Sequence, residues 1–320
     1  MRKALRVLAL VAALPGLAAT AARAETVVTL GAAALSAGSL PIVVAEQKGL
    51  FKAEGITIKR LDFKGGGPAV QALAAGSLDL CICAADHAVK LQSRGLGGRI
   101  LIALADHHSY AMMTLTSNDK ITDLASLKGK KVGITSSGSL TDNTLRYAIK
   151  ELGLDPNKDF EIIGIGRGGP MRAALAAGRI SAGMFTTPAI ELNQSEAGKY
   201  KIVDDFRKMP YPAQDLVATK TWLDKNPKTA RAVARAVYKA LQLIQSDKAV
   251  LRAAVVKMFP KFSPKLVDTV TDDVAAGYLS KDGKMSEESY DLLVKVMQIA
   301  DPSLKKAPYK TVVPLQYLPQ

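Results

Sequence analysis

The feature that most constrains the fold of this chain is an internal repeat, in which two segments match without gaps at an offset of 102 residues. The first runs from Gly66-Gly67-Pro68 to Gly76, and the second from Gly168-Gly169-Pro170 to Gly178. Each unit consists of Gly-Gly-Pro, a short amphipathic helix, a glycine that ends the helix and an apolar strand. Because the period is too long for a solenoid, the repeat predicts two similar α/β lobes built from strand–helix–strand units.

Apolar strands and helices alternate over most of the chain. We expect strands at residues 26–30, 56–62, 78–83, 99–105, 131–135, 160–164, 180–185 and 216–219. We expect helices at residues 40–48, 68–75, 87–93, 141–152, 170–177, 229–246, 248–258, 264–276 and 286–300. This alternation predicts an α/β fold in which both lobes have mainly parallel sheets flanked by helices.

Glycine- and serine-rich loops precede four of the predicted helices. These loops are Ser36 to Ser39, Gly65 to Gly67, Ser136 to Ser139, and Gly168-Gly169. A helix start leaves free N–H donors and a partial positive charge, and glycine lets a ligand approach the backbone. For a single loop, simple helix capping is the alternative. Four such loops at the carboxyl ends of strands predict an anion site between the lobes.

Residue types that carry catalysis or bind metals are scarce. The chain has three histidines, His87, His107 and His108, and the adjacent pair would point to opposite sides of a strand end. Cys81 and Cys83 lie two apart in a predicted buried strand, and we expect them to be free thiols. The glycine run from Gly164 to Gly169 lacks the spacing of a dinucleotide-binding loop. We therefore expect no catalytic residue and no metal site.

Residues 1–24 have the pattern of a secretory signal peptide. Arg2, Lys3 and Arg6 form a basic region at the start of the chain. An apolar stretch follows from Val7 to Leu14, and Ala22-Arg23-Ala24 has the small residues of a cleavage site. We expect cleavage after Ala24, because the stretch is too short to remain as a membrane anchor. Loss of its four basic residues lowers the formal charge from +14 to +10. With 5% aromatic residues and export from the cytoplasm, we expect no nucleic-acid partner.

Five segments carry a family resemblance: LPIVVAEQKGLFKAEGITI, GGGPAVQALAAGSLDL, DLASLKGKKVGITSSGS, LAAGRISAGMFTTPA and LVATKTWLDKNP. They resemble periplasmic solute-binding proteins of ABC transporters, in the nitrate, sulfonate and taurine class that includes thiamine-pyrimidine binders. The resemblance implies a type II binding protein. Residues 25–110 and 213–320 would form lobe I, residues 111–212 would form lobe II, and the chain would cross between them near residues 108–113 and 209–215.

This resemblance implies a periplasmic receptor of an ABC importer. It would capture a small solute, expected to be an anion such as a sulfonate, an oxyanion or an organic carboxylate, and deliver it to a membrane permease driven by a separate ATPase. We expect a monomer without a cofactor and without enzymatic activity. The implied ligand-binding residues are Ser36, Ser39, Gly66, Gly67, Ala84, Ala85, Asp86, Ser136, Ser137, Gly138, Ser139, Gly168, Gly169, Thr186 and Thr187, with Lys64, Tyr110, Arg167 and Phe185 as further candidates.

Other functions remain open. A receptor for a thiamine-precursor pyrimidine would need aromatic stacking, for which the candidates are Phe63, Tyr110, Tyr147, Phe185 and Tyr211. An enzyme on the same fold, similar to thiamine-pyrimidine synthases, would need an arrangement of lysine and histidine for its cofactor that the sequence does not reveal. Regulators with such lobes carry a DNA-binding helix-turn-helix ahead of them, where this chain has the predicted signal peptide.

Overall fold

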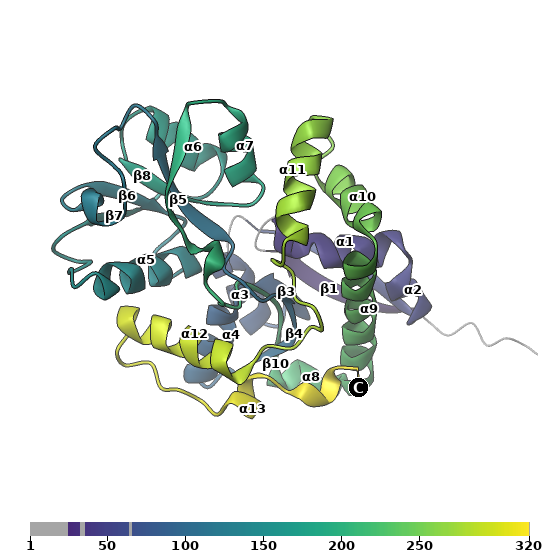
Figure 1. The fold of residues 1–320 in the computed structure, drawn as a ribbon. Helices are drawn as coiled ribbons and strands as arrows, with labels where there is room; N and C mark the ends of the chain where they lie inside the picture. Colours follow the sequence, from purple (N-terminus) through teal and green to yellow (C-terminus); the bar gives the residue numbers. More distant parts are fainter. Residues whose placement is uncertain (1–24, 33–35, 64–65, 320) are drawn as a thin grey trace, which may run out of the picture.

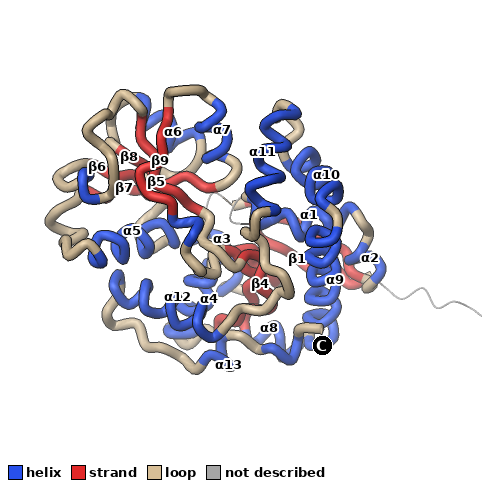
Figure 2. Tube along the Cα trace, viewed as in Figure 1, coloured by secondary structure: helices blue, strands red, loops and turns tan. Residues whose placement is uncertain are grey.

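The computed structural model describes residues 25–32, 36–63 and 66–319 of the 320. They form two five-stranded sheets flanked by helices, in two lobes that lie side by side (Figure 1 and, with strands in red, Figure 2). The predicted two-lobed α/β fold is therefore confirmed. The predicted signal peptide and Lys64 lie outside the described residues.

The sheet of lobe I has the strand order β2-β1-β3-β10-β4. Strands β1, β2 and β3 pair in parallel, whereas β10 pairs antiparallel with both β3 and β4. Four of the five strands therefore run in one direction and β10 runs against them. The bounds are β1 (Thr26–Ala32), β2 (Ile56–Asp62), β3 (Leu80–Cys83), β4 (Gly98–Ala105) and β10 (Gln214–Thr219).

The sheet of lobe II repeats this arrangement with the order β7-β6-β8-β5-β9. Here β6 pairs in parallel with β7 and β8, and β5 is the strand that runs against its neighbours β8 and β9. In each sheet the reversed strand is the one that the chain enters directly after crossing from the other lobe. The bounds are β5 (Tyr110–Leu115), β6 (Lys131–Ile134), β7 (Glu161–Gly164), β8 (Ala182–Thr186) and β9 (Tyr200–Asp205).

Burial explains which strands the sequence reveals. Every residue of β3 and β4 is buried, which fits their continuous apolar runs in a sheet covered on both faces. Strand β2 is an edge strand with half-exposed and exposed residues after Ile56. The sequence did not reveal β5 or β9. Strand β5 begins at Tyr110, and residues 106–109 connect it to β4.

Helices cover both faces of each sheet (Figure 1). The longest is α9 (Pro227–Ser246), which is strongly amphipathic and packs against α1. The other helices of lobe I are α1 (Leu40–Gln47), α2 (Leu50–Ala53), α3 (Gly66–Ala74), α4 (Ala85–Ser93), α8 (Lys220–Lys225), α10 (Lys248–Met258), α11 (Pro264–Ala275), α12 (Glu287–Ala300) and α13 (Tyr309–Val312). Lobe II contains α5 (Leu140–Glu151), α6 (Gly169–Ala176) and α7 (Ala189–Ser195).

One apolar cluster extends across the boundary between the lobes. Helix α5 of lobe II packs against α12, which comes from the C-terminal part of lobe I (Figure 1). Leu145 and Ile149 of α5 and Leu293 and Met297 of α12 are buried and belong to the same cluster. Each fully buried aliphatic side chain contributes about 1.5–3 kcal/mol of transfer free energy. The lobes are therefore joined by a shared core as well as by the two crossing segments.

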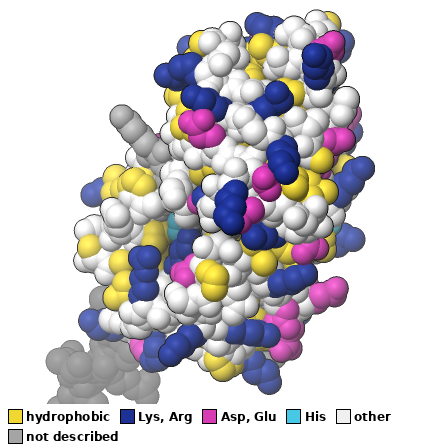
Figure 3. Space-filling view, turned by 90° about the vertical axis from the view of Figure 1, so that its left-hand side faces the viewer, with side chains coloured by type: hydrophobic (Ala, Val, Ile, Leu, Met, Phe, Trp, Pro, Cys, Tyr) yellow, Lys and Arg dark blue, Asp and Glu magenta, His cyan; other side chains and the backbone are white. Residues whose placement is uncertain are grey.

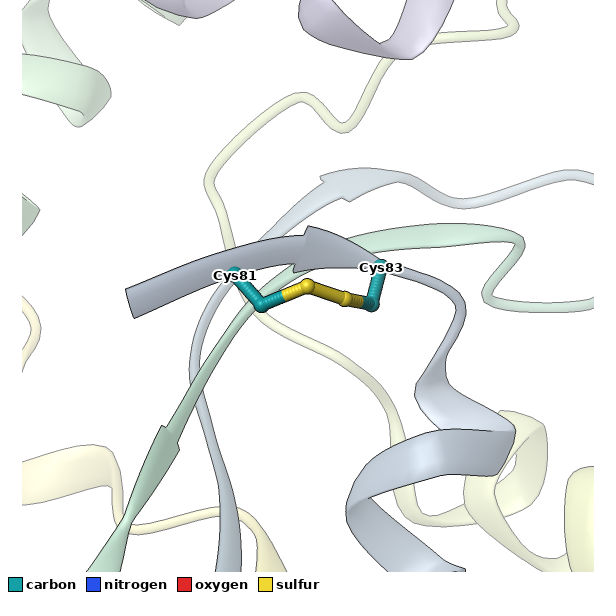
Figure 4. Close-up of a disulfide and its surroundings, with 2 residues drawn as sticks. All are labelled: Cys81 and Cys83. Atoms are coloured by element: carbon teal, nitrogen blue, oxygen red, sulfur yellow. A yellow bond between two sulfur atoms is a disulfide. The ribbon is translucent and has the colours of Figure 1, made fainter. Parts of the chain in front are cut away.

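Cys81 and Cys83 form a disulfide within β3 (Figure 4), so the expectation of two free thiols was wrong. Residues two apart in a strand point to the same face, and the two Cα atoms are 5.5 Å apart, within the usual range for a disulfide. Both residues are fully buried and belong to the same apolar cluster as α4. A regular strand would place these two Cα atoms about 6.6 Å apart, near the upper end of that range, which is why the sequence spacing alone suggested a poor geometry.

Candidate ligand-binding site

A cavity of about 270 Å³ lies between the lobes, where loops from both sheets converge. Lobe I and its crossing segments contribute Ser36, Gly66, Gly67, Pro68, Ala84, His87, Ser109, Ala213 and Gln214. Lobe II contributes Tyr110, Thr135, Ser136, Ser139, Leu140, Gly166, Arg167 and Thr186. The cavity thus combines hydroxyl groups, backbone at helix starts, a few apolar side chains and one guanidinium group.

The loop before α5 presents Ser136 and Ser139 to the cavity. A hydroxyl network holds this loop in shape, because Thr135 Oγ1 donates to Ser139 Oγ and both lie 2.9 Å from Thr141 Oγ1. The backbone N–H of Gly138 donates to Asp142 Oδ2 at 2.7 Å. A carboxylate of the helix's own first turn therefore satisfies part of this helix start, as in ordinary capping.

On the lobe I side, Ser36 and Gln214 face the cavity from two distant parts of the chain. The Ser36 hydroxyl donates to Gln214 Oε1 at 3.2 Å, and both residues are buried. Gly38 supports this contact, because a Cβ atom there would lie 2.4 Å from Gln214 Cγ. The contact joins the loop after β1 to the start of β10, and so fixes one wall of the cavity.

His87 on α4 lines the cavity beside the start of α3. A Cβ atom on Gly66 would lie 2.3 Å from His87 Nε2, so the absence of a side chain at Gly66 allows the loop to pack onto the imidazole ring. Burial lowers the pKa of His87 to about 4. The ring is therefore neutral at pH 7 and offers one donor and one acceptor rather than a charge.

Arg167 is the one charged side chain among the described residues that line the cavity at pH 7, and none of those residues is Asp or Glu. It lies in the loop between β7 and α6, with Gly166 (φ 90°) and Gly168 (φ 56°) on either side. Both φ values fall in the left-handed region that favours glycine, so the loop can turn sharply around Arg167. An Arg without carboxylates in the same wall favours an anionic ligand.

The cavity brings together nine of the residues that the sequence singled out: Ser36, Gly66, Gly67, Ala84, Tyr110, Ser136, Ser139, Arg167 and Thr186. Nine other described candidates do not line it: Ser39, Ala85, Asp86, Ser137, Gly138, Gly168, Gly169, Thr187 and Phe185. Phe185 is buried in the apolar core of lobe II. Of the five aromatic candidates for stacking, Tyr110 is the one that lines the cavity.

Asp86 lies behind the cavity wall and joins the two lobes. Its carboxylate accepts a hydrogen bond from Asn143 Nδ2 of α5 at 2.5 Å and another from the Tyr211 hydroxyl at 3.1 Å. The nearby Asp215 is fully buried, and burial raises the pKa of its carboxyl group well above the usual range, with Asp106 and Asp86 adding to this shift. Asp86 and Asp215 are fully buried and do not line the cavity.

Several lining residues escaped the sequence reasoning for one physical reason. Ser109, Ala213 and Gln214 lie at the amino ends of β5 and β10, the two strands that run against the rest of their sheets. The sequence-based prediction rested on the carboxyl ends of parallel strands, where α/β proteins bind ligands. A reversed strand brings its amino end to that same edge. His87 was missed because it lies in the first turn of α4 and not in the loop before that helix.

The described residues contain no group of three or more His, Cys, Asp and Glu side chains arranged to hold a metal ion. In the same residues, no helix combines the length and the apolar character needed to cross a bilayer.

Comparisons with known proteins place this geometry in context. Among curated proteins, the putative binding protein YtlA of Bacillus subtilis is 23% identical over 287 residues, covering 85% of this chain and 83% of YtlA. A 4-amino-5-hydroxymethyl-2-methylpyrimidine phosphate synthase of Uromyces fabae is 25% identical over 256 residues, covering 76% of this chain and 73% of the synthase. Sequence relatives thus include both a binding protein and an enzyme.

Solved structures with the same fold cover nearly the whole chain. A protein of Bordetella bronchiseptica superposes with a TM-score of 0.80 at 26% identity, covering 92% of this chain and 96% of that protein. The periplasmic aliphatic sulphonate-binding protein SsuA of Escherichia coli gives a TM-score of 0.70 at 20% identity, with coverage of 88% and 94%. The periplasmic nitrate-binding protein NrtA of Synechocystis gives 0.70 at 19% identity, with coverage of 91% and 87%.

The family is shown by a model that matches residues 36–248, about two thirds of the chain. The matched region starts at Ser36 on the cavity wall and includes both sheets except β1. The chain belongs to the NMT1/THI5-like family.

Proposed function

We propose that this protein is the receptor of an ABC importer, which captures a small anionic solute between its lobes and delivers it to a membrane permease. The observation that carries this proposal is the composition of the cavity wall, with Arg167, several hydroxyl groups and no carboxylate among its described residues. A periplasmic location is part of the proposal and rests on the predicted signal peptide and on the periplasmic relatives of the same fold.

The two-lobed architecture supplies the mechanism. A ligand that touches both lobes binds the closed arrangement better than the open one, and so shifts the population toward closure. The cavity meets this condition, because Ser36 and Gln214 approach from lobe I while Ser139 and Arg167 approach from lobe II. Closure would then present one defined surface to the permease.

The proposal is tested by thermal shift and calorimetry on residues 25–320 with nitrate, methanesulfonate, taurine, acetate and benzoate. At least one anion should raise the melting temperature and bind with one-to-one stoichiometry. Ala84→Phe, which adds a ring on the cavity wall, should abolish that binding. The matched change Ala75→Phe, at an exposed position after α3, should leave it intact. If no anion binds the wild type and a neutral pyrimidine does, the receptor binds a different class of solute.

A second candidate is an enzyme similar to the pyrimidine phosphate synthases, and the position of His87 on the cavity wall is the observation that favours it. None of the described lining residues is a lysine. Incubation with pyridoxal phosphate distinguishes the two candidates, because a lysine Schiff base would absorb in the visible range and could be trapped with borohydride. Absence of such an adduct, together with one-to-one anion binding, supports the receptor.

A further inference from the structure

The proposed receptor function leaves open which kind of anion the cavity accepts, and the size of the cavity narrows the choice. Its volume is about 270 Å³, whereas about 10–15 Å³ is enough to hold one water molecule. A bare oxyanion such as nitrate would leave most of this space to water. A single six-membered ring bearing one acidic group would fill much more of it.

The chemistry of the walls is uneven in a way that matches such a ligand. The charge is concentrated at Arg167, on the loop between β7 and α6. Elsewhere the walls include the apolar surfaces of Pro68, Ala84, Leu140 and Ala213. A small oxyanion has no apolar part that could pack against these surfaces. A ring would pack against them, and the release of water from the apolar surfaces would favour binding.

Tyr110 is an aromatic side chain on the cavity wall, and the contacts around it fix its position. It is 9% exposed, lies at the start of β5 and is paired in register with Thr186 of β8. The imidazole ring of His108 packs edge-on against it, with centroids 5.9 Å apart. Burial raises the pKa of Tyr110, so its phenol is neutral at pH 7, and the nearby positive charge of Arg167 opposes this shift. Tyr110 and Arg167 line the same cavity.

We infer that the cavity is built for a monoanion that carries a planar ring, an aromatic or heteroaromatic carboxylate or sulfonate, with Arg167 at the acidic group and Tyr110 beside the ring. This inference rests on the proposed function and specifies its ligand. A guanidinium group matches the paired oxygens of a carboxylate or sulfonate, and aromatic rings gain from offset or edge contacts with tyrosine. The single positive charge among the described lining residues fits one acidic group rather than two.

The test compares benzoate, benzenesulfonate, cyclohexanecarboxylate, methanesulfonate, nitrate and benzamide by calorimetry. Benzoate or benzenesulfonate should bind at least about tenfold more tightly than methanesulfonate or nitrate, and benzamide should bind far more weakly because it lacks the charge. The two aromatic acids separate the carboxylate from the sulfonate. Cyclohexanecarboxylate has the same charge and similar size, so its weaker binding would isolate the contribution of the planar ring.

Two variants assign the roles. Arg167→Gln should weaken binding of the preferred aromatic acid by about 100-fold, because it removes the partner of a buried charge. The matched variant Arg172→Gln, on α6 where Arg172 pairs with Glu196, should not. Tyr110→Leu should weaken binding of the aromatic acid about tenfold while changing the affinity for cyclohexanecarboxylate by less than about threefold.

The outcomes keep the inference separate from the proposed function. If nitrate or methanesulfonate binds as tightly as the aromatic acids, or if Tyr110→Leu affects both ring acids equally, the ring assignment is overturned and the anion receptor stands. If benzamide binds as well as benzoate and Arg167→Gln has no effect, the charge assignment is overturned. If no anion binds the wild type, or if an anion binds Ala84→Phe as tightly as it binds the wild type, the proposed function itself fails.

Discussion

At the scale of single residues, the buried carboxyl group of Glu191 is an instructive case outside the cavity. Its side chain is fully buried on α7, where Thr187 Oγ1 donates to Glu191 Oε1 at 2.8 Å. The Arg207 guanidinium lies 3.3 Å from Glu191 and 3.6 Å from Asp273 of α11 in lobe I, and it also pairs with Asp205. Burial raises the pKa of Glu191 to about 7, and the neighbouring Asp273 adds to the shift.

This pKa predicts a dependence of stability on pH. Because the native pKa lies above the ordinary value of 4.5, the folded protein holds an extra proton between about pH 4.5 and about 7. Stability from this group is therefore complete below that window and is lost as the pH rises through it. The melting temperature of the wild type should fall by several degrees more between pH 5 and pH 8 than that of Glu191→Gln.

The control for this prediction is Glu151→Gln, which changes a half-exposed carboxylate at the end of α5. Its pH profile should follow that of the wild type. Parallel profiles for the wild type and Glu191→Gln would show that Glu191 is already ionised in the native state at pH 5.

The residue scale also shows where sequence reasoning succeeds and where it stops. Serine and glycine at helix starts are recognisable because their local roles are short-range, and Ser36, Gly66 and Ser139 do line the cavity. Asp86 was selected by the same logic, but its carboxylate bonds to Asn143, 57 positions away in the sequence. Only the packing of the lobes decides whether a polar side chain at a helix start meets a ligand or another helix.

At the scale of elements, α4 connects the lobes through two side chains one turn apart. Asp86 accepts a hydrogen bond from Asn143, and Lys90 Nζ donates to the carbonyl group of Gly138. Both partners flank the start of α5, next to the cavity residue Ser139. These contacts join the two lobes at residues that do not line the cavity, and in the proposed mechanism they would favour the closed arrangement.

Lys90→Met should therefore weaken ligand binding by about threefold to tenfold, the effect expected for one hydrogen bond of about 0.5–1.5 kcal/mol. Calorimetry with the preferred anion measures the affinity, and small-angle scattering should show a larger radius for the ligand-free variant. Arg94→Met, four residues further on and directly after the end of α4, changes an exposed basic residue and provides the matched comparison. Equal affinities for the two variants would mean that the contact between Lys90 and Gly138 does not contribute to closure.

Most elements were predictable because their patterns are local. The predicted bounds of helix α10 (Lys248–Met258) and of strand β2 (Ile56–Asp62) agree with the observed ones. Strand β5 was missed because its sequence, YAMMTL, contains alanine and two methionines and has little β-branched character. Its position between β8 and β9 is set by tertiary pairing, and the sequence does not carry that information locally.

At the scale of the whole molecule, charge is distributed rather than concentrated. Lys and Arg side chains are spread over the face shown in Figure 3 and are interspersed with acidic ones. With an expected charge of +10 after loss of residues 1–24, the protein attracts anions from a distance, and salt screens that attraction. The ion pair at Arg167, in a cavity between the lobes, should be screened much less.

Raising the salt concentration from about 20 to about 200 mM should therefore slow association of the preferred anion severalfold and change dissociation little. Stopped-flow measurement of both rates checks this, with the uncharged and weakly bound benzamide as the comparison ligand. A dissociation rate that rises as strongly as the association rate falls would indicate a bound anion exposed to solvent.

The reversed strand β10 has a further consequence, for the order in which the protein can be assembled during synthesis. It lies between β3 and β4, yet the chain reaches it only after the whole of lobe II. The sheet of lobe I therefore stays divided, with β4 unpaired in that sheet, until residues up to Thr219 have emerged. Lobe II, whose reversed strand comes first, can complete its sheet earlier. A nascent chain of this topology completes its fold late, and with the proposed periplasmic location this delay would help the chain to pass through a translocation channel before it folds.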